Sequence, residues 1–567
     1  MRRFRAGVVL FLLYAARVSP AAAQLDPSGT WRTLHTAHFR VHFRPAERAI
    51  ALRAAREAER AYALLAAELR VPRRTVDLAL DDDVDAGNGL TTVFPTPRIV
   101  VNLAVPATDP ALASYDDWLR VVITHELTHA FHLDRTRGPW RFLQAVFGRA
   151  PGLFPEEYQP SWVTEGLATY YESKVTTAGR VRGSFHTEIL AADAAGGESR
   201  RPWDALLYTP WPDGFMPYAY GSRFFHHIAD SLGDSIVPRF VEWTAGQWIP
   251  FRVGRPLDKV GGKNLLAEAW APATRPAISQ VWAVGTKAIV RGLRASPTPE
   301  VSPDGRRVAW LSSDGRGAPR VVIADATTFK PIRTHRVTGQ VTFTWTGDTL
   351  VIAQLDFTSL YVIRSDLYRW TPDGRWRRMT HAARITEPRG GGGVLASVVV
   401  DPAGNHPALP ALPDTVGATW GDVVPSPDGR TIAATRQRNG RWALVRWPRA
   451  APDSLTVLFA PGGVVSAPVW APDGTLFFVA DAVGFPQVMR WTPAAGIAVV
   501  TGDSLGARDP APLPGGDLLY TSVRSDGWIL MHAWPASRAA DTTTFVASFD
   551  TAAAVTSRET GYDAWPS

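Results

Sequence analysis

The sequence predicts an α+β region followed by an all-β propeller, a fold in which small sheets surround a central axis. Up to about residue 290 the chain alternates strand-like and helix-like patterns, whereas from about residue 296 it consists of short apolar runs separated by turns. A length of 567 residues supports two or three domains. A composition of 46% hydrophobic and 20% charged residues is typical of a folded globular protein.

The N-terminus has the pattern of a signal peptide that spans residues 1–23. A basic start precedes an apolar run at residues 6–16, and Ala21, Ala22 and Ala23 form a small-residue cleavage site. The apolar run is too short to span a bilayer, and no later stretch of the sequence reaches that length. We therefore expect an exported protein, periplasmic or secreted, with no transmembrane segment in the mature chain.

Net charge and cysteine usage exclude several classes of function. The formal charge of +7 includes four arginines of the signal peptide, so it does not indicate a nucleic-acid partner. The absence of cysteine excludes disulfides, a thiol nucleophile and thiolate metal ligands. An exported chain without disulfides favours a bacterial source.

The region after the signal peptide begins with alternating strands and helices. Residues 38–43, 75–80 and 98–104 have the patterns of strands, and residues 46–70, which lack glycine and proline, predict a long helix. An extended substrate could pair with the strand at 98–104 if that strand lies at the edge of the sheet. The acidic stretch at residues 81–89 is interpreted as a solvated loop, with a calcium site at its three aspartates as the alternative.

Residues 118–133 predict the central helix of this region, and they carry the motif H-E-x-x-H without an interrupting proline. Because residues four apart lie on one face of a helix, the imidazoles of His125 and His129 can bind one metal ion, with Glu126 beside it. Such ligands suit Zn²⁺, which leaves one position for water. Zinc acidifies that water and the glutamate takes its proton, so the motif predicts attack on a carbonyl group, usually a peptide bond. The alternative is a core helix that carries two surface histidines.

A second helix is predicted to begin near Ser161 and to supply the third ligand, Glu165. A carboxylate among apolar residues should be paired or bound to metal. The apolar neighbours of Glu165 in the sequence are Trp162, Val163, Leu167 and Ala168. Glu172 lies two turns further along the same face, where it could orient a ligand histidine. The alternative for both carboxylates is an ordinary surface glutamate.

The two helices together carry a family resemblance. H-E-L-T-H followed by W-x-x-E-G-L-A-x-Y-x-E resembles the gluzincin branch of zinc metallopeptidases, the thermolysin and M1 aminopeptidase superfamily called peptidase MA. The resemblance implies a zincin-like fold for residues 24–290, one Zn²⁺ held by His125, His129 and Glu165, and Glu126 as the general base. The gap between His129 and Glu165 is longer than in standard members, so the resemblance is to the superfamily.

The resemblance extends to a third segment. Residues 217–222 are similar to the Y-x-x-G-A segment of M1 enzymes, which implies that Tyr218 donates a hydrogen bond to the tetrahedral oxyanion. Tyr218 also falls on an apolar helical stripe, so a core tyrosine is the alternative. Tyr220, His226 and His227 remain open as donors.

Two further observations limit the resemblance. The G-x-M-E-N segment with which M1 enzymes anchor a free N-terminus has no counterpart here, since residues 87–91 stand near its place but lack its glutamate. Endopeptidase activity is therefore expected. His132, three residues after His129, is interpreted as a neighbour on the helix surface and not as a fourth ligand.

Recurrent turns predict a β-propeller over residues 291–567. Pro-Asp-Gly makes a tight turn because proline presets its φ angle and glycine accepts a positive φ. Copies begin at Pro303, Pro427 and Pro472, and weaker copies lie near residues 345, 390 and 514. A spacing of roughly 40–45 residues is that of a four-stranded blade, which gives about six blades, and the poor copy near 390 leaves seven open. The pattern resembles the TolB-type propeller. The G-x-S-x-G match at residues 502–506 is interpreted as a turn, since it lacks the helix that a serine nucleophile needs.

These patterns predict an exported zinc peptidase, more specifically an endopeptidase. Its partners would be a peptide or protein substrate and a protein bound by the propeller, which could also gate or brace the active site. The competing hypothesis is a non-enzymatic envelope protein that acts through its propeller and holds a structural zinc. An intermediate hypothesis is an enzyme that hydrolyses a non-peptide amide or an ester.

Overall fold

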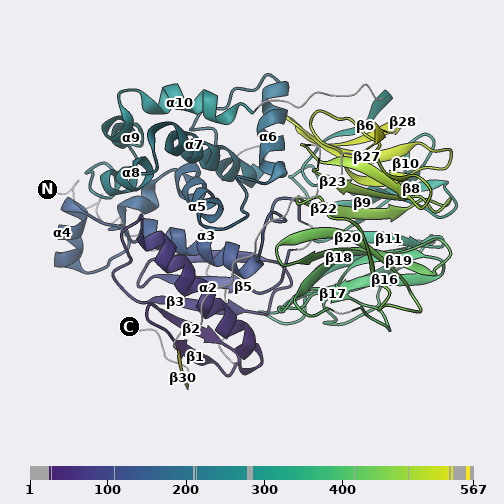
Figure 1. The fold of residues 1–567 in the computed structure, drawn as a ribbon, viewed down its shortest axis with the longest axis horizontal. Helices are drawn as coiled ribbons and strands as arrows, with labels where there is room; N and C mark the ends of the chain where they lie inside the picture. The colour runs from purple at the N-terminus through teal and green to yellow at the C-terminus, as the bar shows by residue number, and fades with distance from the viewer. Residues whose placement is uncertain are drawn as a thin grey trace, which may run out of the picture.

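A computed structural model describes most of the chain. The described residues are 25–26, 29–106, 109–207, 211, 213–276, 285–413, 415–482, 484–534, 538–539 and 557–561. The predicted signal peptide lies outside them. The structure has an N-terminal α/β region followed by a six-bladed β-propeller (Figure 1).

The α/β region contains a six-stranded mixed sheet with strand order β30-β1-β2-β3-β5-β4. Its strands are β1 (Arg32–His35), β2 (Phe39–Phe43), β3 (Val76–Asp81), β4 (Asn88–Thr92), β5 (Arg98–Asn102) and β30 (Arg558–Gly561). The pairs β2/β3 and β3/β5 are parallel, whereas β4 runs antiparallel to β5 and forms one edge of the sheet. The last strand, β30, comes from the C-terminal end of the chain and lies beside β1 (Figure 1).

Helices pack against this sheet and against one another. They are α2 (Arg48–Ala66), α3 (Trp118–Leu133), α4 (Gly138–Phe147), α5 (Ser161–Val175), α6 (Ser184–Ala195), α7 (Met216–Leu232), α8 (Ile236–Thr244), α9 (Gly254–Gly261) and α10 (Leu265–Thr274). Helix α3 begins where the Asp117 carboxylate accepts a hydrogen bond from the Arg120 backbone N–H, and all its residues from Trp118 to His132 are buried. It is therefore a core helix on every face.

Helices α5 and α7 approach each other closely because each has a glycine at the contact. A Cβ atom on Gly221 would lie 2.0 Å from the Trp162 carbonyl oxygen, and one on Gly166 would lie 2.5 Å from the Gly221 backbone. No side chain fits between these backbones. The close packing brings the first turn of α7, with Tyr218, beside the middle of α5.

The propeller has six sheets, which confirms the predicted six blades. They are β7–β10 (Glu300–Val301, Arg307–Ser312, Arg320–Asp325, Pro331–Arg336), β11–β14 (Thr342–Thr346, Thr349–Phe357, Ile363–Trp370, Trp376–Arg378) and β15–β17 (Ile385–Gly391, Val394–Val399, His406–Pro407). The others are β18–β21 (Ala418–Pro425, Thr431–Arg438, Arg441–Pro448, Thr456–Phe459), β22–β25 with β29 (Val465–Trp470, Leu476–Ala480, Gln487–Thr492, Gly496–Val499, Arg538–Ala539), and β26–β28 with β6 (Arg508–Pro512, Leu518–Arg524, Gly527–Trp534, Gly285–Leu293). The poor repeat near residue 390 is the three-stranded blade.

The first strand of the propeller closes its last blade. Strand β6 pairs with β28, so the sheet extends across the predicted limit at residue 290. Strand β30 carries the chain from the propeller back to the N-terminal sheet. Residues 502–506 form an irregular turn before β26, as the sequence predicts. In the part of the chain that the structure describes, no helix has the length and apolar character needed to cross a membrane.

The two regions share an extensive buried contact. Buried apolar side chains of α3, α5 and α7 belong to one continuous cluster with blade residues such as Trp442 and Leu444. Trp442 Nε1 donates to the Ala113 carbonyl at 3.2 Å, Gln437 Nε2 donates to the Asp116 carbonyl at 2.8 Å, and Arg508 pairs with Glu188 at 2.7 Å. The propeller therefore packs directly against the segment that leads into α3.

Candidate metal centre

Three predicted ligands converge from two helices. His125 and His129 lie one turn apart on α3, and Glu165 lies on α5. Glu165 Oε2 is 3.4 Å from His125 Nε2 and 3.3 Å from His129 Nε2. The ligand atoms of the three residues all lie within 4.8 Å of one another, so this group could hold a metal ion. Two imidazoles and a carboxylate are a donor set that suits Zn²⁺.

Glu126 is held at the same place by strand β4. The Thr91 hydroxyl lies 2.7 Å from Glu126 Oε2 and 2.9 Å from the Glu126 carbonyl oxygen, either of which can accept its proton. A Cβ atom on Gly89 would lie 2.5 Å from Glu126 Oε1, so a larger residue at this position would displace the carboxylate. Strand β4 therefore fixes the position of Glu126.

Glu172 and Arg180 hold the outer side of His125. His125 Nδ1 lies 3.0 Å from Glu172 Oε2, and Arg180 Nη2 lies 2.7 Å from each of these two atoms. The backbone N–H of Arg180 also donates to Glu172 Oε1 at 2.8 Å. In the tautomer that leaves Nε2 free for a metal, His125 Nδ1–H donates to Glu172. The carboxylate thereby orients the ring.

Tyr218 completes the group from α7. Its ring stacks near that of His125, with centroids 6.1 Å apart, and the Arg180 guanidinium lies 4.8 Å from its centroid. Burial and the nearby Glu165 raise the pKa of the Tyr218 hydroxyl, so it remains a neutral donor. Of the other candidate donors, Tyr220 donates to Asp193 Oδ2 at 2.7 Å and His226 lines a separate pocket.

The charges of the cluster are strongly coupled. Burial alone would raise the pKa of Glu165, but His129 and His125 outweigh burial and hold this pKa well below its usual range. Burial and Arg180 oppose a positive charge on His125, yet Glu165 and Glu172 raise the pKa of its imidazole to about 9. Arg180 likewise outweighs burial and lowers the pKa of Glu172. The two carboxylates therefore favour a positive charge between them.

The cluster opens into a cavity of about 500 Å³. Residues of β4, of α3 and of the start of α5 line it. Lining residues outside the cluster include Leu90, Leu112, Ser114, Trp118, Glu157 and Thr164. The space can admit part of an extended chain next to Glu126 and Tyr218.

The condition for substrate pairing at residues 98–104 is not met, because β5 lies between β3 and β4, and β4, which begins inside the predicted acidic loop, forms this edge of the sheet. Two expectations from the sequence are wrong. His132 is not on the surface, because its side chain is buried with Nε2 3.0 Å from Glu156 Oε2. The acidic loop is not solvated either, since Asp81 and Asp83 are buried and Asp83 pairs with Arg44.

Arg180 and Thr91 are the site residues that sequence reasoning missed. Arg180 lies in an irregular segment after α5, where no periodicity assigns it to a face. Thr91 belongs to residues 87–91, which stand near the place of the G-x-M-E-N segment. That motif points to a glutamate and not to a hydroxyl group. A search for donors near the H-E-x-x-H glutamate on the neighbouring strand could have found it.

Sequence comparisons do not assign the chain to a family: no family profile matches it, and no curated protein sequence does. Solved structures that resemble it include TolB from Acinetobacter baumannii, at 17% identity and a TM-score of 0.23 over 45% of this chain and 55% of that one. Others are the Pyrococcus horikoshii acylaminoacyl peptidase, at 11% identity and a TM-score of 0.27 over 36% and 37%, and oligogalacturonate lyase from Vibrio parahaemolyticus, at 10% identity and a TM-score of 0.29 over 45% and 98%. The chain thus spans about half the length of the TolB from Acinetobacter baumannii. TolB structures are among the structural neighbours of this propeller-containing protein.

Proposed function

We propose that this protein is an exported zinc endopeptidase of the gluzincin type. The observation that carries the proposal is the convergence of His125, His129 and Glu165 beside Glu126 at an open cavity. A structural zinc site is usually closed by four protein ligands, whereas catalytic sites keep one position open. Among the described residues, only these three form a group that could hold a metal, which favours the enzyme over the scaffold hypothesis.

The residues of the chain have complementary roles in the proposed reaction. A zinc ion in the site would act as a Lewis acid and lower the pKa of bound water. Glu126, steadied by Thr91, takes a proton from the attacking water and returns it to the leaving amine. Tyr218 donates its hydroxyl proton as a hydrogen bond to the oxygen of the tetrahedral intermediate. Glu172 keeps the His125 ring in place, and Arg180 in turn holds Glu172.

The substrate would bind as an extended segment along β4. Among the described residues this strand pairs with β5 alone in the sheet, and it lines the cavity together with Glu126. An edge strand offers backbone N–H and C=O groups to a peptide that adds to the sheet. Backbone pairing places a scissile bond anywhere along a chain, which favours internal cleavage.

The experiment that tests the function is a digestion of unfolded proteins by the mature protein, with new N-termini identified by mass spectrometry. We expect internal cleavage that a chelator abolishes and added zinc restores. Release of single terminal residues would indicate an exopeptidase, and hydrolysis of esters or other amides alone would indicate a different substrate class. Zinc-loaded protein that generates no new termini would contradict the proposal.

Tyr218→Phe should lower kcat by about 10²–10³-fold with little change in KM, since it removes one donor to the developing oxyanion. Tyr220→Phe is the matched control, because that hydroxyl bonds Asp193 from the same helix outside the cavity. Steady-state kinetics on one peptide substrate distinguishes them. If both variants lose activity equally, Tyr218 has only a packing role.

A further inference from the structure

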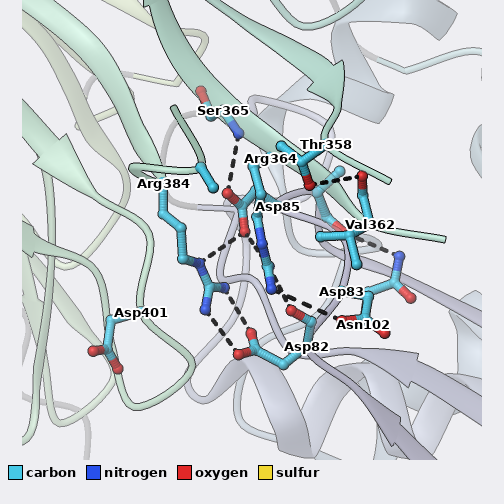
Figure 2. Close-up of polar contacts among 12 residues, drawn as sticks. Asp82, Asp83, Asp85, Asn102, Thr358, Val362, Arg364, Ser365, Arg384 and Asp401 are labelled. Atoms are coloured by element: carbon cyan, nitrogen blue, oxygen red, sulfur yellow. Dashed lines mark hydrogen bonds and ion pairs between the residues drawn. The ribbon is translucent and has the colours of Figure 1, made fainter. Parts of the chain in front are cut away.

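Two arginines of the propeller hold the loop that leads into β4. Arg384 Nη2 lies 2.6 Å from Asp82 Oδ1, and Arg384 Nε lies 2.9 Å from Asp85 Oδ1. Arg364 Nη1 also lies 2.9 Å from Asp85 Oδ1, and the Ser365 backbone N–H donates to Asp85 Oδ2 at 3.0 Å. Figure 2 shows both guanidinium groups directed at the two aspartates. Burial raises the pKa of Asp85 above its usual value, and Arg384 and Arg364 oppose this rise.

The backbone of the same loop pairs with a blade strand. Ile363, the first residue of β13, accepts a hydrogen bond from the Asp85 N–H at 3.1 Å and donates to the Asp83 carbonyl at 2.9 Å. Val84 thereby forms a parallel bridge with Ile363. Side chains and backbone fix the loop to the propeller together.

The connection from this loop to β4 is short and is held by further contacts. Only Ala86 and Gly87 lie between Asp85 and Asn88, and these three steps of the chain span at most about 10 Å. The Asn102 side chain donates to the Ala86 carbonyl at 3.2 Å, and a Cβ atom on Gly87 would lie 2.8 Å from the Ala104 carbonyl oxygen. A displacement of the loop therefore moves the start of β4.

Strand β4 in turn lies against Glu126 at Gly89 and Thr91, and its residues 88–91 line the cavity. Within the described part of the chain, β5 is its one neighbour in the sheet. An edge strand with one neighbour depends on its ends for a fixed position. One of those ends is the loop held by the propeller.

We propose that Arg364 and Arg384 are positioning residues for the active site, which fix β4 and Glu126 through Asp82 and Asp85. This inference rests on the proposed function for its catalytic consequence. It gives the propeller a role as a brace of the peptide-binding strand. The side-chain contacts join residues that are 279–302 positions apart in the chain.

The test compares Arg384→Met with Arg378→Met in the full-length mature protein. Arg378 lies in β14, in the blade that also carries Arg364, and pairs at 2.6 Å with Asp366, whose side chain is fully buried. Its other polar contacts among the described residues are to Thr380 and Asp356 of the propeller. Two more variants change the ion pair between Arg384 and Asp82, one at each partner. They are Arg384→Lys and Asp82→Asn. Hydrogen–deuterium exchange of residues 88–92 reports the strand without any need for turnover.

Arg384→Met should speed exchange at residues 88–92 by about tenfold or more, while Arg378→Met leaves it unchanged. The value of kcat/KM should fall by about tenfold or more, because displacement of a catalytic group by about 1 Å can cost 10²-fold. Zinc content should stay the same, since no ligand is on β4. Arg384→Lys should restore part of the loss, and Asp82→Asn should add little to Arg384→Met.

If Arg384→Met leaves the exchange rate at residues 88–92 unchanged, the proposal is overturned, whatever the activity of the variant. Faster exchange with kcat/KM equal to that of the Arg378→Met control would overturn the catalytic part. A failure of the proposed function is distinguishable, because the wild-type protein would then lack turnover while the exchange difference between the two variants remained.

Discussion

Replacing Glu126 with glutamine is expected to lower kcat by about 10²–10⁴-fold or more, because the proposed reaction loses its general base. Zinc content should not change, since the three ligands are on His125, His129 and Glu165. Glutamine has nearly the same shape and can still accept from the Thr91 hydroxyl. The variant therefore tests proton transfer and leaves the packing of β4 against α3 intact.

Glu157→Gln is the control for charge in the cavity. Glu157 lines the same space but is not a member of the ligand group. We expect its kcat to remain far above that of Glu126→Gln when both are assayed on one peptide. Equal losses would mean that cavity charge, and not a specific base, determines the rate.

Glu165→Gln is expected to weaken zinc binding by more than about 100-fold, since even outer partners of zinc ligands typically contribute 10- to 100-fold. A neutral amide replaces the only anionic donor among the three ligands. Activity should fall with metal occupancy and recover in part at high zinc. Competition with a chromophoric chelator measures the affinity directly.

Glu156→Gln separates loss of metal from loss of fold. Glu156 is a fully buried glutamate that binds His132 of α3 and Thr244 of α8. The substitution disturbs α3, which carries His125 and His129, without touching a ligand. Thermal stability should therefore fall while zinc affinity stays near that of the wild type. Equal zinc affinities in the two variants would remove Glu165 from the ligand set.

The group of His125, His129 and Glu165, which could hold a metal, could be predicted from the sequence because much of its geometry is local. A helical H-E-x-x-H fixes the relation of His125 to His129 by spacing alone. Glu165 could be added because its apolar neighbours require a partner for a carboxylate. The turns of the propeller could be predicted for the same reason, since each Pro-Asp-Gly copy is a short-range signal.

The contacts that the sequence did not predict are long-range or lack periodicity. Strand β4 is short and glycine-containing, so it has no alternating pattern. Asp82 and Asp85 look like a solvated loop until their partners, Arg364 and Arg384, are brought from a distant blade. His132 is buried because partners cover every face of α3, which a search for one apolar face does not anticipate.

The most direct test of the central claim is X-ray absorption spectroscopy at the zinc edge on the purified mature protein. We predict one zinc per chain with two imidazole nitrogens at about 2.0–2.1 Å and oxygen ligands at about 2.0–2.2 Å. One oxygen of the first coordination shell should be replaced by a sulfur at about 2.3 Å when a thiol inhibitor binds in its place. Absence of zinc, or a closed shell of four protein ligands that no inhibitor changes, would contradict the assignment of a catalytic metal centre.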